Sequence, residues 1–119
     1  MIIIGHKDIP SVSFCFISGI DEINSSSANS IVCFDYDIQL LKYCYDNDIK
    51  YAVKVNSIKE AIFSNSLDAM YILSNKDLAT NLQSIAQTYM FDSKNIAIIE
   101  DEDMIEHLAL KEVDGVMIV

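Results

Sequence analysis

Short apolar runs alternate with helix-period patterns along most of this chain, and that alternation constrains the fold more than any other feature. The first clear run, residues 31–34, stops abruptly at Asp35, and a helical pattern follows it. The same plan repeats until the chain ends on the apolar run 116–119. Short runs without polar residues are typical of strands buried on both faces, and parallel strands need crossovers between them. The alternation therefore predicts an α/β fold with a parallel sheet.

The periodicity also places the individual elements. The clearest helix start is Ser57, because Glu60 follows it three residues later in the spacing of a capping box. The longest helical pattern runs from Leu78 to Met90, with apolar residues on one face. The acids of residues 100–103 are expected in the first turn of the last helix, where the macrodipole favours them. The expected strands are residues 31–34, 51–55, 69–73, 96–99 and 116–119.

Five strands and four helices over residues 31–119 match the flavodoxin-like sheet order 2-1-3-4-5, with residues 31–34 as strand 1. Helices would then cover both faces, which makes a three-layer α/β/α sandwich. Lys54 supports this order, because it gives strand 2 the charge of a protected edge strand while strands 1, 3 and 4 are wholly apolar. Half of a (βα)8 barrel is the alternative, and a flat rather than curled sheet would exclude it.

The first thirty residues differ from the rest. Residues 2–4 and 12–17 read as strands with Pro10 between them, which predicts an N-terminal β-hairpin arm. A Ser- and Asn-rich surface loop, residues 24–30, connects this arm to the repeating part, and we expect residues 1–119 to form a single domain. Because residues 116–119 carry no charge that would discourage edge pairing, we expect the hairpin or a second subunit to cover that strand.

Composition excludes several classes of function. The net charge is −10, and all eight basic residues are lysines, so a nucleic-acid partner is not expected. The three cysteines show no CxxC spacing, which indicates reduced thiols in a cytoplasmic protein. The N-terminal apolar run is interrupted at His6, so we expect neither a membrane span nor a signal peptide.

Polar residues that follow the strands are candidates for a site. In open α/β sheets, ligands bind outside the carboxyl ends of the strands at the point where the strand order reverses. The expected order delivers to that point Asp35, Asp37, Ser74, Asn75 and Lys76, with Asp101 beside them. Oxygen ligands suit Mg²⁺ shared with a phosphate group, and the metal ligands would be Asp35, Asp37 and Asp101. The alternative is that the acids are ordinary turn and helix-cap residues.

The run Asp35-Tyr36-Asp37 and the strand-end Ser74 resemble the first two motifs of the haloacid dehalogenase superfamily. The acid Asp101, next to Glu100, resembles its acidic fourth motif. The resemblance implies Asp35 as nucleophile, Asp37 as general acid/base, Ser74 as phosphate ligand and Asp101 as metal ligand. A complete βα unit between Asp35 and Ser74 departs from the family pattern. The repeat also resembles phosphoacceptor receiver domains, although Ser74 stands where a receiver has its phosphorylated Asp.

Two functions follow as expectations. The first is a noncatalytic protein-interaction or regulatory domain that self-associates as a homo-oligomer, because the apolar fraction is 51% and no complete catalytic set is assembled. The second is Mg²⁺-dependent binding or transfer of a phosphate group by the residues named above. Whether the chain is an enzyme stays open at this point.

Overall fold

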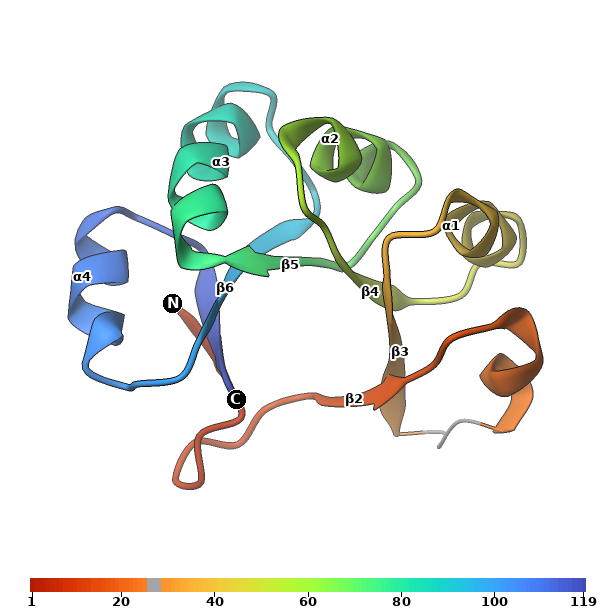
Figure 1. Cartoon of the computed structure of the whole chain (residues 1–119), viewed down its shortest axis with the longest axis horizontal. Helices are drawn as coiled ribbons and strands as arrows, with labels where there is room; N and C mark the ends of the chain where they lie inside the picture. Colours follow the sequence, from red (N-terminus) through yellow and green to blue (C-terminus); the bar gives the residue numbers. More distant parts are fainter. Residues whose placement is uncertain (26–28) are drawn as a thin grey trace.

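The computed structural model of this chain describes residues 1–25 and 29–119, and over these residues seven strands form one parallel sheet. The strand order is β1-β7-β6-β5-β4-β3-β2 (Figure 1). The strands are β1 (Ile2–Ile4), β2 (Ser13–Phe16), β3 (Ser30–Asp35), β4 (Tyr51–Lys54), β5 (Tyr71–Asn75), β6 (Lys94–Ile99) and β7 (Gly115–Ile118). The helices are η1 (Ile20–Ser25), α1 (Ile38–Asp46), α2 (Ile58–Ser66), α3 (Lys76–Thr88) and α4 (Met104–Leu110).

The sheet is curled rather than flat. Strands β2 to β7 lie side by side in the order of the sequence, and β1 is added beyond β7. Right-handed crossovers that always advance in one direction place every helix on the same face. Figure 1 shows the strands arranged around a common centre, with α1 to α4 on the outer side. Over the described residues no ladder joins β1 to β2, so the sheet stays open between these two edges.

The α/β class and the parallel sheet are confirmed, whereas the flavodoxin-like order 2-1-3-4-5 is wrong. The strand expected at an edge, β4, lies between β3 and β5. All helices cover one face, so the arrangement is not the expected α/β/α sandwich. A flat sheet would have excluded the half-barrel alternative, and this sheet is curled. The charge of Lys54 does not indicate an edge strand. Lys54 is the last residue of β4, and a side chain at the end of a strand reaches solvent even when the strand lies inside the sheet.

The N-terminal hairpin is also wrong. Strand β1 pairs in parallel with β7 and β2 pairs in parallel with β3, so the two lie at opposite edges of the sheet. The last strand is covered, as expected, but by β1 alone and not by a hairpin, since Ile2, Ile3 and Ile4 are in register with β7. The expected surface loop at residues 24–30 includes residues 26–28, which lie outside the described residues.

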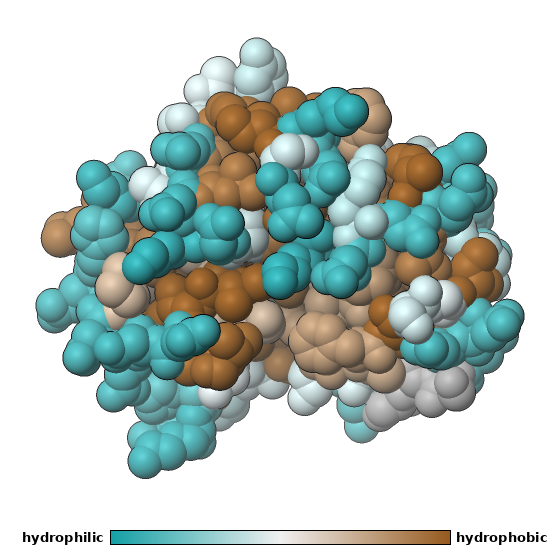
Figure 2. Space-filling view, in the orientation of Figure 1, coloured by the Kyte–Doolittle hydropathy of each residue, from teal (hydrophilic) through white to brown (hydrophobic). Residues whose placement is uncertain are grey.

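The surface mixes hydrophilic and apolar side chains. Figure 2 shows hydrophilic residues over much of one face, with apolar patches between them. The most exposed large apolar side chains are Met90, Leu110, Tyr89 and Phe16. Among residues 1–25 and 29–119, none of the helices has the length and apolar character that crossing a bilayer requires.

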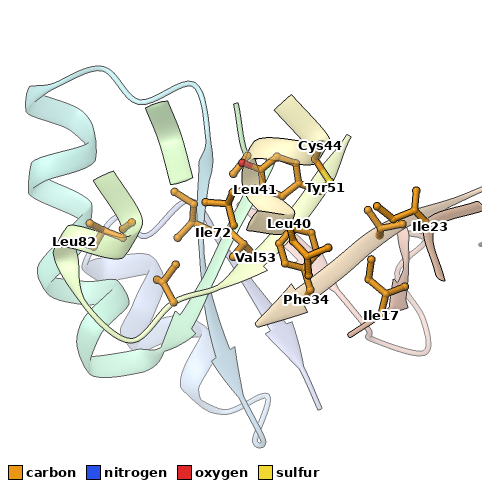
Figure 3. Close-up of a cluster of buried hydrophobic side chains, with 14 residues drawn as sticks. Ile17, Ile23, Phe34, Leu40, Leu41, Cys44, Tyr51, Val53, Ile72 and Leu82 are labelled. Carbon is orange, nitrogen blue, oxygen red and sulfur yellow. The ribbon is translucent and has the colours of Figure 1, made fainter. Parts of the chain in front are cut away.

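The outer face of the sheet packs under the helices. One cluster joins Phe34, Tyr51 and Ile72 from the strands to Leu41 and Leu82 from α1 and α3 (Figure 3). The rings of Phe34 and Tyr51 stack with centroids 5.4 Å apart. The Tyr51 hydroxyl donates to the Leu67 carbonyl at 2.7 Å, so this buried phenol is satisfied. A second outer cluster lies under α3 and α4 and includes Ala97, Leu108 and Val116.

The inner face packs against itself. Its buried members are Ile4, Cys33, Ala52, Tyr71, Leu73, Ile96 and Met117. Over the described residues this cluster draws on strands and on Val12, and on no helix. Phe14 and Tyr71 meet across it in an edge arrangement, with ring centroids 5.7 Å apart. Because side chains alternate along a strand, membership of this cluster identifies which residues point inward.

Candidate functional site

The predicted site residues all lie at the rim formed by the carboxyl ends of the strands. Asp35 ends β3, and Ser74 and Asn75 end β5. Asp37 precedes α1, Lys76 begins α3, and Asp101 follows β6. In curled parallel sheets with outer helices, this rim is where loops carry ligand-binding residues. The predicted residues therefore lie at one end of the sheet, as expected, even though the expected strand order is wrong.

Two of these residues satisfy backbone amides at helix starts. The Asp37 carboxylate accepts from the amides of Gln39 and Leu40, at 2.9 and 3.4 Å. The Asn75 side-chain oxygen accepts from the Leu78 amide at 2.8 Å. The turn-and-cap interpretation therefore describes both positions. Such contacts stabilise the start of a helix by about 1 kcal/mol each.

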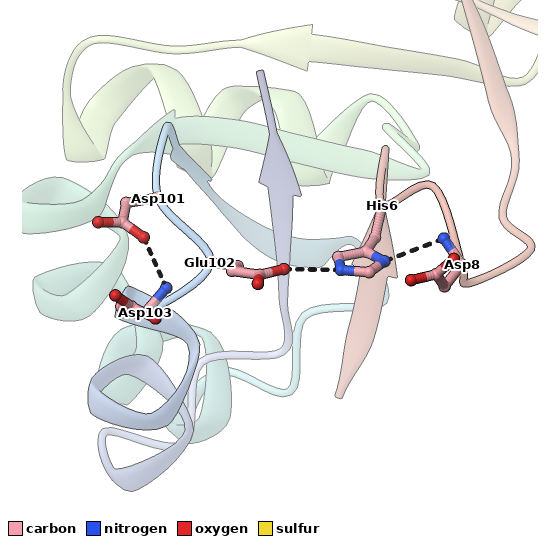
Figure 4. Close-up of polar contacts among 5 residues, drawn as sticks. All are labelled: His6, Asp8, Asp101, Glu102 and Asp103. Carbon is pink, nitrogen blue, oxygen red and sulfur yellow. Dashed lines mark hydrogen bonds and ion pairs between the residues drawn. The ribbon is translucent and has the colours of Figure 1, made fainter.

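The acids before α4 behave similarly, but not as expected. They precede the helix instead of occupying its first turn, which begins at Met104. The Asp101 carboxylate accepts from the Asp103 amide at 2.9 Å and so closes a local turn (Figure 4). Asp103 stands at the N-cap position without a side-chain hydrogen bond of its own.

Ser74 is turned away from the rim. It is fully buried and alternates with Leu73, so it points to the outer face, as Ile72 does. Its hydroxyl has no hydrogen-bond partner among the described residues. A phosphate at the rim would face Asn75 and Lys76 rather than this hydroxyl.

The carboxylates do not converge on one point. Within residues 1–25 and 29–119, no group of three or more His, Cys, Asp or Glu side chains is placed to hold a metal ion. A hollow does bring together three of the predicted residues, Asn75, Lys76 and Asp101, with Glu100 beside them. One ammonium and two carboxylates therefore share a recess between the ends of β5 and β6.

Three residues on neighbouring strands present a different set of groups at the same rim. Phe16 ends β2, Asp35 ends β3 and Lys54 ends β4, and these strands are adjacent in the sheet. Each lies two residues beyond a member of the inner cluster, namely Phe14, Cys33 and Ala52. Alternation therefore points all three toward the inner face. We refer to Phe16, Asp35 and Lys54 as the inner rim.

Lys54 and Phe16 are not among the site residues that the sequence predicts. The expected sheet order explains Lys54 as the charge of an edge strand, and the expected hairpin contains Phe16. The signal that could have identified Lys54 is the alternation within β4, where Tyr51 and Val53 face the helices and Ala52 faces the interior. The alternation becomes informative only when it is known that helices cover one face of the sheet and that the other face packs against itself.

The Cys33 thiol beneath the rim is uncharged. Burial, with a smaller effect from the Asp35 charge, raises the pKa of the Cys33 thiol to about 12. This thiol is therefore protonated at neutral pH and acts as an apolar residue in the floor beneath Asp35. Cys33 and Cys44 are buried and Cys15 is half-buried, and all three are free cysteines.

His6 makes a further polar contact at this end of the sheet. Its Nε2 lies 2.7 Å from the Glu102 carboxylate, and its Nδ1 accepts from the Asp8 amide at 3.0 Å (Figure 4). A neutral imidazole with its proton on Nε2 satisfies both contacts. The pair ties the segment after β1 to the turn before α4.

No known protein-family model matches this chain, and no curated protein matches it. Interpretation of the site therefore rests on its geometry and chemistry.

Proposed function

We propose that this protein is a noncatalytic, cytoplasmic interaction module that associates with a second copy of itself through the open side of its curled sheet. The observation that carries this proposal is the composition of the two edge strands. Strand β1 reads Ile-Ile-Ile and β2 reads Ser-Phe-Cys-Phe, so neither edge carries a charge. Natural edge strands are usually protected by charges, by Pro or by a cover, because an uncharged edge is a template for further pairing.

Apolar surface beside these edges supports the same proposal. A groove runs between β1 and the segment that leads to β2, and its walls include Met1, Ile9, Pro10 and Tyr71. The side chains of Met1 and Ile9 are 52% and 43% exposed, which leaves apolar surface in contact with water at the opening. Apolar surface gathered along an unpaired edge is typical of an interface.

The charge of the chain restricts where two copies could meet. At a net charge of −10, two copies repel each other over most of their surfaces. An interface therefore has to use a surface without acids, and the β2 edge is such a surface. Because salt screens the repulsion, self-association should strengthen as the ionic strength rises.

The test is the molar mass in solution, measured by light scattering after size exclusion over a range of protein concentrations. Ser13→Lys places a charge on β2 at an exposed position, and Ser84→Lys places the same charge at an exposed position on α3. We expect the wild type and Ser84→Lys to be dimeric and Ser13→Lys to be monomeric. A wild type that stays monomeric at every concentration and salt level would refute the proposal, as would equal behaviour of the two variants.

A second candidate function is Mg²⁺-dependent binding of a phosphate ligand at the rim. The hollow that holds Asn75, Lys76 and Asp101 favours it, because Mg²⁺ is usually held by one or two carboxylates together with substrate phosphates. The measurement is the melting temperature with Mg²⁺ and inorganic phosphate, in the wild type, in Lys76→Ala and in the exposed control Lys42→Ala. Binding would raise the melting temperature of the wild type and the control but not of Lys76→Ala. No shift in any of the three would remove this candidate.

A further inference from the structure

The inner rim places three different chemical groups on three adjacent strands. Phe16 is level with Cys33, and Asp35 is level with Lys54. Neighbouring strands are separated by about 4.8 Å, so the bases of the Asp35 and Lys54 side chains are close neighbours that point the same way. The rim therefore presents an aromatic ring, a carboxylate and an ammonium group in sequence along its edge.

The two charges of the inner rim do not neutralise each other by direct contact. Over the part of the chain that the structure describes, neither side chain has a hydrogen-bond or ion-pair partner, and both residues are exposed. They are cross-strand neighbours of opposite charge that stand side by side at the end of the sheet. Here each group is free to bind a group of opposite charge from a ligand.

Phe16 supplies the apolar part of the same surface. It points inward, yet it is 68% exposed, whereas Phe14 one step below it is partly buried. The two rings meet edge to face, with centroids 6.4 Å apart. Below Asp35 lies Cys33, which is buried and neutral, so the floor is apolar. An exposed inward-facing aromatic ring above an apolar floor can cover the apolar portion of a small molecule.

The surrounding charges decide which ligand fits. Asp37, Glu100 and Asp101 lie at the same end of the sheet, and the whole chain is strongly acidic. A simple anion would be attracted by Lys54 but repelled by these carboxylates, and a simple cation would be repelled by Lys54. A zwitterion meets each charge with its complement. In an α-amino acid the ammonium and carboxylate flank one carbon, a spacing that suits side chains from neighbouring strands.

We propose that the inner rim binds an apolar α-amino acid, with the ligand carboxylate on Lys54, the ligand ammonium on Asp35 and the ligand side chain against Phe16. Asp35 and Lys54 belong to inner strands, whereas Phe16 ends β2, which is one of the open edges used in the self-association proposed above. The Ser13→Lys variant, which is expected to be monomeric, therefore shows whether amino-acid binding needs the second copy.

The test uses L-phenylalanine as the probe and backbone amide NMR shifts as the readout. Two matched compounds test the contribution of each ligand charge separately, because 3-phenylpropanoate lacks the ammonium group and 2-phenylethylamine lacks the carboxylate. We expect saturable shifts with L-phenylalanine at the amides around Phe16, Asp35 and Lys54, and weaker binding of each matched compound. Inorganic phosphate should not compete at these amides.

Variants show whether the named side chains carry the binding. Lys54→Met and Asp35→Asn each remove one charge at little change in size, and each should weaken L-phenylalanine binding about tenfold or more, as expected for a lost hydrogen bond to a charged group. Lys42→Met, at an exposed position on α1, should leave the affinity unchanged. The proposal is overturned if the folded wild type shows no saturable shifts with L-phenylalanine, or if 3-phenylpropanoate binds as tightly. Equal loss of affinity in Lys42→Met and Lys54→Met would overturn it as well.

Discussion

Gly115 stands where β1, β7 and β6 meet. It is level with Ile2 on one side and with Ile96 on the other. A Cβ atom at this position would lie 2.6 Å from the Ile2 carbonyl oxygen and 2.8 Å from the Ile96 Cδ1 atom. The absence of a side chain therefore allows β1 to pair closely enough to cover the edge of β7.

Gly115→Ala should lower the free energy of unfolding by about 1–3 kcal/mol, because β1 has to move away from the added methyl group. The matched control is Gly19→Ala, since a Cβ atom there has nothing within 4 Å, and its effect should stay within about 0.5 kcal/mol. Urea denaturation of both variants measures the difference. Equal effects would show that β1 is not packed against Gly115 as described.

The buried thiols predict how stability depends on alkaline pH. Burial raises the pKa of Cys33 from an ordinary 9.0 to about 12, and the pKa of Cys44 to about 11. Below pH 9 these thiols are protonated in both the folded and the unfolded state. Above it the unfolded chain loses its thiol protons first, so the unfolded state binds fewer protons and stability falls until about pH 12 is reached.

Cys33→Ala should therefore reduce the loss of stability that the wild type shows between about pH 8 and about pH 10. The measurement is the urea midpoint at each pH, and the readout is the difference between the two midpoints. The change of side-chain volume lowers both midpoints together and so cancels from that difference. A pH dependence identical to that of the wild type would contradict the prediction.

At the scale of elements, a polar network joins α3 to β6 and to the start of β7. The Asp114 carboxylate accepts from the Asn95 amide at 2.9 Å and from the Gln83 side-chain amide at 3.1 Å. Gln83 Oε1 accepts in return from the Asp114 amide and from Asn95 Nδ2. The Asp114 carbonyl also accepts from the Ile2 amide, so β1 is held by the same turn. Gln83 and Asn95 are buried, and this network supplies partners for both polar side-chain atoms of Gln83 and for Asn95 Nδ2, whereas Asn95 Oδ1 has none among the described residues.

Asp114→Ala should cost about 1–3 kcal/mol, because it leaves the buried donors of Asn95 and Gln83 without their acceptor. Asp92→Ala is the control, since Asp92 is exposed and lies just before β6. Chemical denaturation compares the two, and amide exchange shows where the loss occurs. We expect faster exchange in β1 and β7 for Asp114→Ala only. Unchanged exchange in both strands would contradict the role assigned to the network.

At the scale of the whole molecule, the net charge of −10 opposes compactness. Raising the ionic strength from about 0.01 M to about 0.15 M shortens the screening length from about 30 Å to about 8 Å and weakens this self-repulsion. The melting temperature should therefore rise with salt. Ser13→Lys is the suitable protein for this measurement, because its expected monomeric state separates folding from association. A melting temperature that falls with salt would contradict the prediction.

Local signals were sufficient to place most elements. The helical pattern expected after residues 31–34 is present as α1, and the cap at Ser57 is confirmed by its bond with the Glu60 amide at 3.1 Å. The returning Glu60 carboxylate binds the amide of Asn56 instead of the amide of Ser57. Capping and periodicity depend on residues within a few positions of each other, so a sequence reveals them directly. Residues that pair across the sheet leave no such signal.

By itself the sequence determined the alternation of strands and helices, the parallel α/β class and the rim where Asp35, Asn75 and Lys76 lie. Only the tertiary structure decided that the sheet curls, that every helix covers one face and that β1 and β2 form the open edges. The physical reason is that both arrangements bury the two faces of a strand. In a sandwich, helices cover both faces, and in this curled sheet, helices cover one face while the other packs against neighbouring strands. The two arrangements therefore require the same apolar residues. The order of the strands depends on contacts such as Ile2 with Gly115, which are far apart in the chain.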